Sequence, residues 1–431
     1  MCEEQLRMDN FESVREGHSS DEIPPGYKKT EVGIIPEDWE VKRLRDCLVG
    51  QPEYGINASA VSYSENLPTY IRITDITDEG RFSSENIASV ATDSYHNFLL
   101  TDGDVVFART GASVGKYYRY RPGDGALVFA GFLIRVHPDR SKLLPQFLEA
   151  YLGTSPYWNW VRLMSARSGQ PGINGKEYSI LPVPVTSIAE QAAIAEVLTD
   201  VDNLIESLDN LIDKKQAIKK ATMQQLLTGR TRLPGFEGEW ELKQLGTFAC
   251  VRSYRVFPAS VNPETICIEL EHIEQGTGRL CAYSKAAESE SSKFLFFSGD
   301  ILFGRLRPYL KKFWLAKQNG LCSTEIWPLN VSTSDILNNF LFYVVQTEQF
   351  LEASGVSYGT HMPRADWKVL RELLIAIPAI EEQRAITSIL LDMDAEIEAL
   401  ERQRDKTKQI KQGMMQQLLT GRIRLLDKEA V

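Results

Sequence analysis

Two stretches of the chain combine cationic and aromatic side chains in the way that nucleic-acid-binding surfaces do. GDVVFARTGASVGKYYRYR lies at residues 103–121, and GDILFGRLRPYLKKFW at residues 299–314. Guanidinium and ammonium groups neutralise phosphates, and the planar fork of arginine can also read guanine edges. The alternative is a β-hairpin whose aromatic residues are core and whose cations are solvated, and the stretches alone favour neither interpretation. The cations are Arg109, Lys116, Arg119 and Arg121 in the first stretch and Arg305, Arg307, Lys311 and Lys312 in the second.

Two polar loops add further candidates for DNA contact. They are SARSGQPGING at residues 165–175 and GTHMPRADW at residues 359–367. We predict a DNA-binding set in each half of the chain. Its members are Arg109, Ser113, Lys116, Arg119, Arg167, Gln170 and Asn174 in the first half, and Arg305, Arg307, Tyr309, Lys311, Lys312, His361 and Arg364 in the second.

Signals of catalysis are absent or false. GASVGK at residues 111–116 is one residue shorter than a phosphate-binding loop, and Tyr117 stands where Ser or Thr would hold magnesium. PPGY and SPYW only approximate an amino-methyltransferase motif, and the nuclease-like Asp213-Lys214-Lys215 lies on an expected helix. The five histidines and six cysteines show no metal-ligand spacing. The sequence therefore predicts no catalytic residue, no metal site and no cofactor held by this chain.

The chain contains an internal repeat. MQQLLTGRTRL at residues 223–233 recurs as MQQLLTGRIRL at residues 415–425, with ten of eleven positions identical at an offset of 192. Weaker matches lie upstream, where Gly103, Asp104 and Arg109 meet Gly299, Asp300 and Arg305 at an offset of 196. Each copy has about 150 divergent residues followed by about 40 similar ones. We expect the similar segments to share one task and the divergent segments to perform separate ones.

The similar segments have the pattern of long helices. Apolar residues recur at alternating spacings of four and three, which is a heptad seam. Each helix would be roughly 60 Å long at ~1.5 Å per residue, with Gly229 and Gly421 expected as left-handed caps beyond the ends. The predicted helix-pairing seam comprises Ile194, Leu198, Val201, Ile205, Leu208, Ile212, Ile386, Leu390, Met393, Ile397 and Leu400.

The charge pattern predicts how these helices pair. Acidic residues dominate the N-terminal half of each helix and basic residues the C-terminal half. Antiparallel packing would place each acidic half on the basic half of the other helix, whereas parallel packing would align like charges. The alternative is that both charge runs are solvated faces that complement their own helix dipoles. We expect an antiparallel pair with a pseudo-twofold axis.

The divergent segments mix short β-rich runs with helical patches, which is typical of α/β units. The expected fold is therefore mixed α/β, with two globular domains separated by two long antiparallel coiled-coil helices. The domain boundaries that we predict are an acidic tail at 1–25, globular domains at 26–187 and 231–379, a central helix at 188–230, and a C-terminal helix and tail at 380–431.

Composition and charge limit the class of protein. With 431 residues, 43% hydrophobic and 25% charged, the chain has the composition of a globular protein of two or three domains. No apolar run is long enough to cross a membrane, and the first residues do not resemble a secretion signal, so we expect a cytoplasmic protein. The net charge of −10 resides mostly in the tail and the two helical segments. The globular segments are near neutral, which leaves room for local basic patches.

Several of these motifs together resemble the specificity subunit of type I restriction-modification systems. They are GYKKTEVGIIPEDWEVKRL at residues 26–44, GDILFGRLRPYLKK with CSTE at residues 322–325, GTHMPRADW, and the two EQ-x-x-I helices that end in QQLLTGR. The resemblance covers nearly the whole chain from Gly26 onward, and the motifs occur in the family's order.

The resemblance implies a protein without an active site of its own. Each recognition domain would read one half of a bipartite target in double-stranded DNA, while the helices would set the spacer and hold two methyltransferase subunits. Restriction subunits would join the full complex. S-adenosylmethionine, ATP and Mg would be bound only by these partners, and no membrane is involved. Individual base contacts cannot be carried over, because these domains vary with their targets.

The role of the N-terminal stretch and the class of protein both leave alternatives open. The acidic stretch at residues 1–23 departs from the family pattern, and we expect it to be disordered or to occupy a groove on a partner. The chain could also be a stand-alone DNA methyltransferase or nuclease with unrecognised motifs. A third hypothesis is a coiled-coil scaffold that binds only proteins.

Overall fold

The computed structural model describes residues 23–166, 169–355 and 363–425. The expectation for the acidic tail thus falls almost entirely outside the described residues. The chain divides into two compact units, which we call unit 1 (residues 1–206 and 405–431) and unit 2 (residues 207–404). Of the described helices, none is apolar enough over a sufficient length to cross a bilayer.

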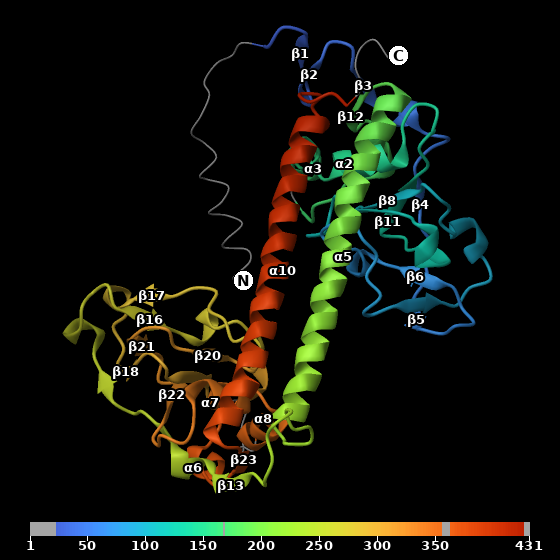
Figure 1. Cartoon of the computed structure of the whole chain (residues 1–431). Coiled ribbons are helices and arrows are strands. Elements are labelled where there is room, and N and C mark those ends of the chain that lie inside the picture. The colour runs from blue at the N-terminus through green and yellow to red at the C-terminus, as the bar shows by residue number, and fades with distance from the viewer. Residues whose placement is uncertain (1–22, 167–168, 356–362, 426–431) are drawn as a thin grey trace. The chain divides into compact units, whose positions relative to one another are not determined.

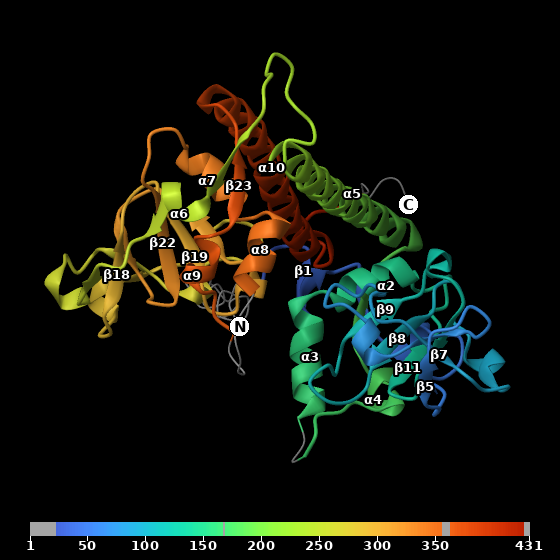
Figure 2. The same cartoon turned by 90° about the horizontal axis from the view of Figure 1, so that it is seen from below.

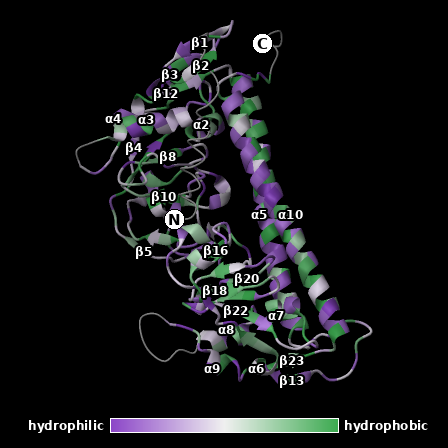
Figure 3. Cartoon of the chain, turned by 90° about the vertical axis from the view of Figure 1, so that its left-hand side faces the viewer, coloured by the Kyte–Doolittle hydropathy of each residue, from purple (hydrophilic) through white to green (hydrophobic). Residues whose placement is uncertain are grey.

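The two longest helices confirm the prediction from the heptad pattern. They are α5 (Ile188–Leu226) and α10 (Ile380–Leu418), of 39 residues each. Apolar and polar residues alternate along both of them (Figure 3). Gly229 and Gly421 follow the helices with φ of +67° and +64°, the left-handed conformation expected of a glycine cap.

The helices run antiparallel within each unit (Figures 1 and 2). In unit 2, partners along α5 meet residues in reverse order along α10: Asp209 with Arg404 at 3.4 Å, Lys215 with Glu396 at 2.6 Å and Lys219 with Asp394 at 2.5 Å. In unit 1, Asp202 pairs with Lys411 at 2.7 Å. The charge runs are therefore engaged in ion pairs between the helices, beyond complementing their own dipoles.

Seam residues near the N-terminal ends of the helices enter the cores of the two units. Ile194 and Leu198 lie in the core of unit 1 with Leu418 and Leu419 from the end of α10. Ile386 and Leu390 lie in the core of unit 2 with Leu226 from α5, among others. Of the other predicted seam residues, Leu208, Ile212 and Ile397 are buried, and Val201, Ile205, Met393 and Leu400 are half-buried.

The described residues of unit 1 form two four-stranded sheets and two antiparallel ribbons of two strands each. One sheet has the order β4 (Glu53–Tyr54), β11 (Leu133–Val136), β8 (Val105–Ala108), β9 (Tyr117–Arg119). The other has the order β10 (Leu127–Phe129), β6 (Thr69–Ile71), β7 (Ala88–Val90), β5 (Ala60–Ser62). The ribbons pair β1 (Tyr27–Thr30) with β2 (Gly33–Pro36) and β3 (Glu40–Arg43) with β12 (Pro182–Val185). The helices are α2 (Pro145–Leu152), α3 (Ser155–Ser165) and α4 (Gly175–Ser179).

Unit 2 repeats this plan with different sequences. Its first sheet has the order β14 (Ala249–Val251), β22 (Ile326–Val331), β19 (Ile301–Gly304), β20 (Phe313–Leu315). Its second has the order β15 (Arg255–Val256), β18 (Lys293–Phe296), β21 (Gly320–Cys322), β16 (Ile266–Ile268), β17 (Ser284–Lys285). A ribbon pairs β13 (Glu241–Gln244) with β23 (Leu374–Ile377). The helices are α6 (Leu245–Phe248), α7 (Asn338–Val344), α8 (Glu348–Gly355) and α9 (Trp367–Leu370).

The repeated Glu-Gln pair at the start of each long helix fastens that helix to its unit. The buried amide of Gln191 donates to the carbonyl oxygens of Lys142 and Thr186 and accepts from the backbone of Leu144. Gln383 makes the same three bonds in unit 2. Because an unpaired buried amide would be destabilising, the repeated glutamines fix the direction in which each helix leaves its unit.

The repeated Gly-Asp pair shapes the turn before the central strand of each first sheet. Asp104 Oδ2 accepts from the backbone of Thr101 at 2.8 Å, and Asp300 Oδ2 accepts from Phe297 at 2.9 Å. Burial raises the pKa of Asp300, which the Phe297 hydrogen bond and Arg252 partly counter. These aspartates hold the strands that lead into the cationic loops.

Candidate nucleic-acid interface

Two segments that are far apart in the sequence meet in unit 1. One is the loop at residues 109–116, which joins β8 to β9, and the other is the segment at residues 169–174, which precedes α4. Gly111 N donates to Pro171 O at 3.0 Å, and Ile173 N donates to Arg109 O at 2.9 Å. The structure thus brings together two stretches that the sequence analysis predicted separately as candidates for DNA contact.

The same junction recurs in unit 2. The loop at residues 305–312 joins β19 to β20 and meets the segment at residues 363–366, which precedes α9. Arg307 N donates to Pro363 O, and Ala365 N donates to Arg305 O, both at 2.8 Å. We call these two junctions the paired loops of unit 1 and unit 2. Their backbones are alike, while their side chains differ.

One arginine in each pair of loops is stacked on an aromatic ring. The guanidinium of Arg109 lies 5.0 Å from the ring centre of Tyr54, and that of Arg305 lies 5.4 Å from the ring centre of Trp327. Within the described parts of the chain, neither guanidinium donates a hydrogen bond. Stacking orders the planar fork and leaves its N–H groups available to a ligand.

Glu325 does not satisfy Arg305. Its carboxylate accepts two bonds from Arg364, at 3.0 and 3.1 Å, which raises the pKa of Arg364, whereas Arg305 approaches it only to 4.0 Å. Among buried side-chain nitrogens and oxygens of the described residues, Nε of Arg305 alone has no hydrogen-bond partner. Such a group is uncommon in folded proteins and calls for an explanation.

Four predicted DNA contacts are half-buried and also engaged inside their own unit, and we remove them from the candidate set. Arg119 is 11% exposed and pairs with Glu149 at 2.5 Å, so it is not available to DNA. The side chain of Asn174 caps α4 by accepting from the backbone of Glu177. Lys116 pairs with Asp78, and Lys312 donates to the carbonyl oxygen of Leu270, each at 2.7 Å.

The other predicted residues lie on or beside the paired loops. In unit 2, Arg307, Tyr309 and Arg364 are exposed, although Arg364 is paired with Glu325. In unit 1, Ser113 is half-buried and Gln170 is exposed, with its amide nitrogen 3.2 Å from where a Cβ at Gly111 would lie. Arg167 and His361 lie outside the described residues.

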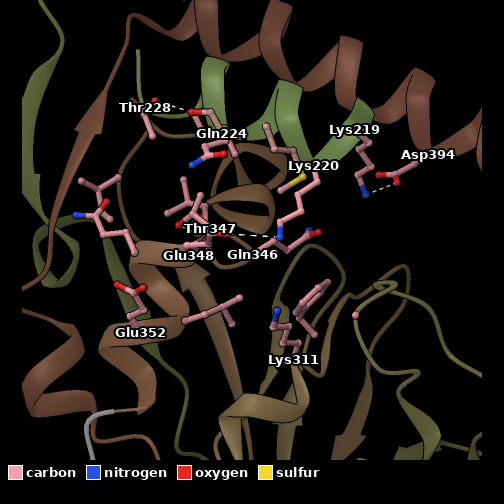
Figure 4. A pocket seen from close by; sticks show the side chains of 18 of the residues that line it. Lys219, Lys220, Gln224, Thr228, Lys311, Gln346, Thr347, Glu348, Glu352 and Asp394 are labelled. Atoms are coloured by element: carbon pink, nitrogen blue, oxygen red, sulfur yellow. Dashed lines mark hydrogen bonds and ion pairs between the residues drawn. The ribbon is translucent and has the colours of Figure 1, made fainter. Parts of the chain in front are cut away.

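Lys311 belongs to the same loop, but its side chain lies on the wall of a cavity of about 680 Å³ in unit 2 (Figure 4). Residues of α5, α8, β23 and α10 line much of the rest of this cavity. Its charges are mixed and partly paired: Lys219 with Asp394, and Lys220 with Glu348 at 3.5 Å. We therefore do not assign the cavity to the nucleic-acid interface.

The sequence did not reveal the aromatic platforms Tyr54 and Trp327. Trp327 stands two residues beyond the CSTE motif, and Tyr54 lies in the short stretch PEYG. No spacing rule connects either residue with its arginine, because each platform belongs to a different strand from the loop that it supports. Only pairing of the strands brings them together.

The described residues repeat one plan of sheets, ribbon and paired loops in two units, and each unit includes parts of the two long antiparallel helices. The family model described as "Type I restriction modification DNA specificity domain" matches residues 36–218 and 237–412. This chain belongs to that family. The resemblance that the motifs suggested is confirmed, as is the fold class.

Similar proteins agree with this assignment. The chain is 25% identical to a putative type I restriction enzyme MjaX specificity subunit of Methanocaldococcus jannaschii, over 93% of this chain and 97% of that protein. It is 22% identical to the MjaVIII specificity subunit of the same organism, over 91% of this chain and 94% of that one. It is also 26% identical to the EcoDI specificity subunit of Escherichia coli, over 54% of this chain and 59% of that protein.

Solved structures share the fold. The S subunit of a type I restriction-modification system from M. genitalium has a TM-score of 0.55 at 14% identity, covering 88% of this chain and 96% of that chain. A chain from a structural study of assembly and conformational transition of the type I R-M system has a TM-score of 0.52 at 17% identity, covering 90% and 99%.

Proposed function

We propose that this chain is the non-catalytic reader of a bipartite DNA target. The paired loops of unit 1 would read one half-site, and those of unit 2 the other. The observation that supports this most is the duplicated stacked arginine, Arg109 and Arg305, whose guanidinium is stacked on a ring and donates no hydrogen bond to a described residue. Arginine forks of this kind match O6 and N7 of guanine in the major groove.

The long helices would set the spacer between the half-sites and hold two methyltransferase subunits. Exposed apolar side chains on α5 support docking, because Leu211 and Ile218 are 38% and 42% exposed and stand seven residues apart. In the full complex, restriction subunits would join. S-adenosylmethionine, ATP and Mg would be bound by these partners, and the chain would hold no cofactor of its own.

The test uses the full chain produced with its methyltransferase partner in a host that lacks other adenine methylation. Single-molecule detection of methylated adenines should reveal a bipartite motif. Arg109→Ala should relax one half of the motif and Arg305→Ala the other, by about 1–3 kcal/mol for each lost base contact. Arg140→Ala and Arg371→Ala are matched controls, since both arginines are exposed and paired with neighbouring acids.

The outcome separates the proposal from its rivals. If both variants weaken both half-sites equally, the arginines are structural and the paired loops do not read bases. If the chain alone methylates DNA without a partner, it is an enzyme and the non-catalytic assignment is wrong.

A further inference from the structure

The loops at residues 109–116 and 305–312 have the same backbone hydrogen bonds. They differ in the residues at the two positions where the backbone is left-handed. Ala108 N donates to Lys116 O at 2.7 Å, and Gly304 N donates to Lys312 O at 2.8 Å. Inside the loops, Val114 N bonds Gly111 O at 3.1 Å, and Leu310 N bonds Arg307 O at 2.9 Å. Both loops are eight residues long and align position by position in the sequence at an offset of 196.

Unit 1 uses glycine at both left-handed positions, and unit 2 does not. Gly111 and Gly115 have φ of +78° and +89°, whereas the equivalent Arg307 and Lys311 have φ of +52° and +50°. No other non-glycine residue in the described parts of the chain has positive φ. A side chain with a Cβ is strained in this region, and glycine is not. Unit 2 is therefore less stable here than the same loop with glycine would be.

Among the described residues of unit 2, none forms a side-chain hydrogen bond or ion pair with Arg307 that would offset the strain of its backbone. Its side chain is exposed, and its guanidinium donates no hydrogen bond to a described residue. Its backbone is fixed on both sides, by Pro363 O and by Leu310 N. Lys311 is also exposed, but its side chain lies on the wall of the cavity in unit 2 and not beside Arg305 and Trp327. A strained residue with an exposed, unpaired cation points to a ligand from outside the unit.

The neighbouring side chains indicate what that ligand is. Arg305, two residues before, stacks its guanidinium on Trp327 and leaves Nε without a hydrogen bond, and Tyr309, two residues after, is 60% exposed. Two arginine forks and a phenol on one rigid turn match base edges and phosphates of DNA. The equivalent positions in unit 1 are Gly111 and Ser113, so that loop offers backbone and a hydroxyl group instead.

We propose that Arg307 determines base specificity at the half-site read by unit 2, at the expense of loop stability, and that unit 1 has no counterpart to it. This inference rests on the proposed function. It adds that the two half-sites are read by different chemistry although the two loops share one backbone.

The experiment compares three substitutions in the full chain assembled with its methyltransferase partner. Arg307→Gly removes both the side chain and the strain, Arg307→Ala removes the side chain but keeps the strain, and Arg307→Lys keeps the charge and the strain but loses the fork. The probe is a pool of random-sequence duplexes from which each assembly selects its sites. Thermal unfolding of each chain is measured in parallel, and Arg371→Ala serves as the control for loss of an exposed arginine.

All three substitutions should relax one half-site, with roughly tenfold less preference for its selected base. Only Arg307→Gly should also raise the melting temperature, by about 2–4 °C. Unchanged selection in all three variants overturns the proposal, and so does a uniform loss over all sequences, which would make Arg307 a phosphate contact. A melting temperature that is no higher for Gly than for Ala overturns the strain argument. If the wild-type assembly itself selects no bipartite motif, the proposed function fails first.

Discussion

Arg424, just beyond the end of α10, donates to Glu190 in the first turn of α5 at 2.9 Å. The same guanidinium bonds Asp38, and Trp39 Nε1 donates to Glu190 at 3.1 Å. Unit 2 repeats the arrangement with Arg232, Glu382 and Trp240. The arginine at the end of each repeat thus pairs with the glutamate in the first turn of the other long helix. This contact explains why the TGR-x-R motif occurs at the same place in both repeats.

Removing this arginine should destabilise unit 1. Glu190 is 2% exposed, so Arg424→Ala would leave a buried carboxylate without its cation. The loss of one partner of a buried pair lowers the free energy of unfolding by about 3 kcal/mol. Urea denaturation checks this value. Arg422→Ala is the matched control, because Arg422 is exposed on the same tail and should change stability by less than about 0.5 kcal/mol. Equal effects of the two substitutions would mean that the pair is not structural.

Two adjacent leucines on α10 test the packing of the seam. Leu390 is fully buried in the core of unit 2, and Leu391 is 40% exposed. Leu390→Ala should lower the free energy of unfolding by about 3 kcal/mol, because it leaves a cavity in the core. Leu391→Ala keeps the same helix propensity change and should lower it by less than about 1 kcal/mol. The two values are compared by urea denaturation, and a larger loss for Leu391 would place the seam on the wrong face.

The two long helices, which we propose set the spacer, can be shortened together without disturbing their pairing register. Residues 203–209 and 404–410 lie between the pairs Asp202–Lys411 and Asp209–Arg404, with the second pair included. Deleting both segments removes one heptad from each helix, about 10 Å of length. Detection of methylated adenines should then show unchanged half-sites with a spacer shorter by about three base pairs. Deletion from only one helix, as a control, should abolish the register and the activity. An unchanged spacer in the double deletion would contradict the proposal that the helices set the spacer.

The long helices and the repeat were accessible from the sequence, because both are properties of local spacing. Heptad positions such as Ile194 and Ile386 report helical periodicity without any knowledge of the fold. The short β-rich runs were accessible for a similar reason, and β8 and β19 are two such continuous apolar runs. The acid and base halves of the helices also indicated their antiparallel pairing correctly.

The sequence did not show which cationic side chains remain available to contact DNA. Arg119 and Arg109 look alike in the sequence, yet Arg119 meets Glu149, thirty residues away, while Arg109 meets Tyr54 on another strand. A side chain is paired or unpaired according to what the fold brings beside it, and a carboxylate within reach removes a cation from the surface. The alignment at an offset of 196 did place Arg307 on Gly111, but its meaning depended on the backbone angle at that position. The periodicity of one strand or helix depends on residues close together in the sequence and can be predicted from it. Electrostatic partners come from distant chain segments, which only folding brings into contact.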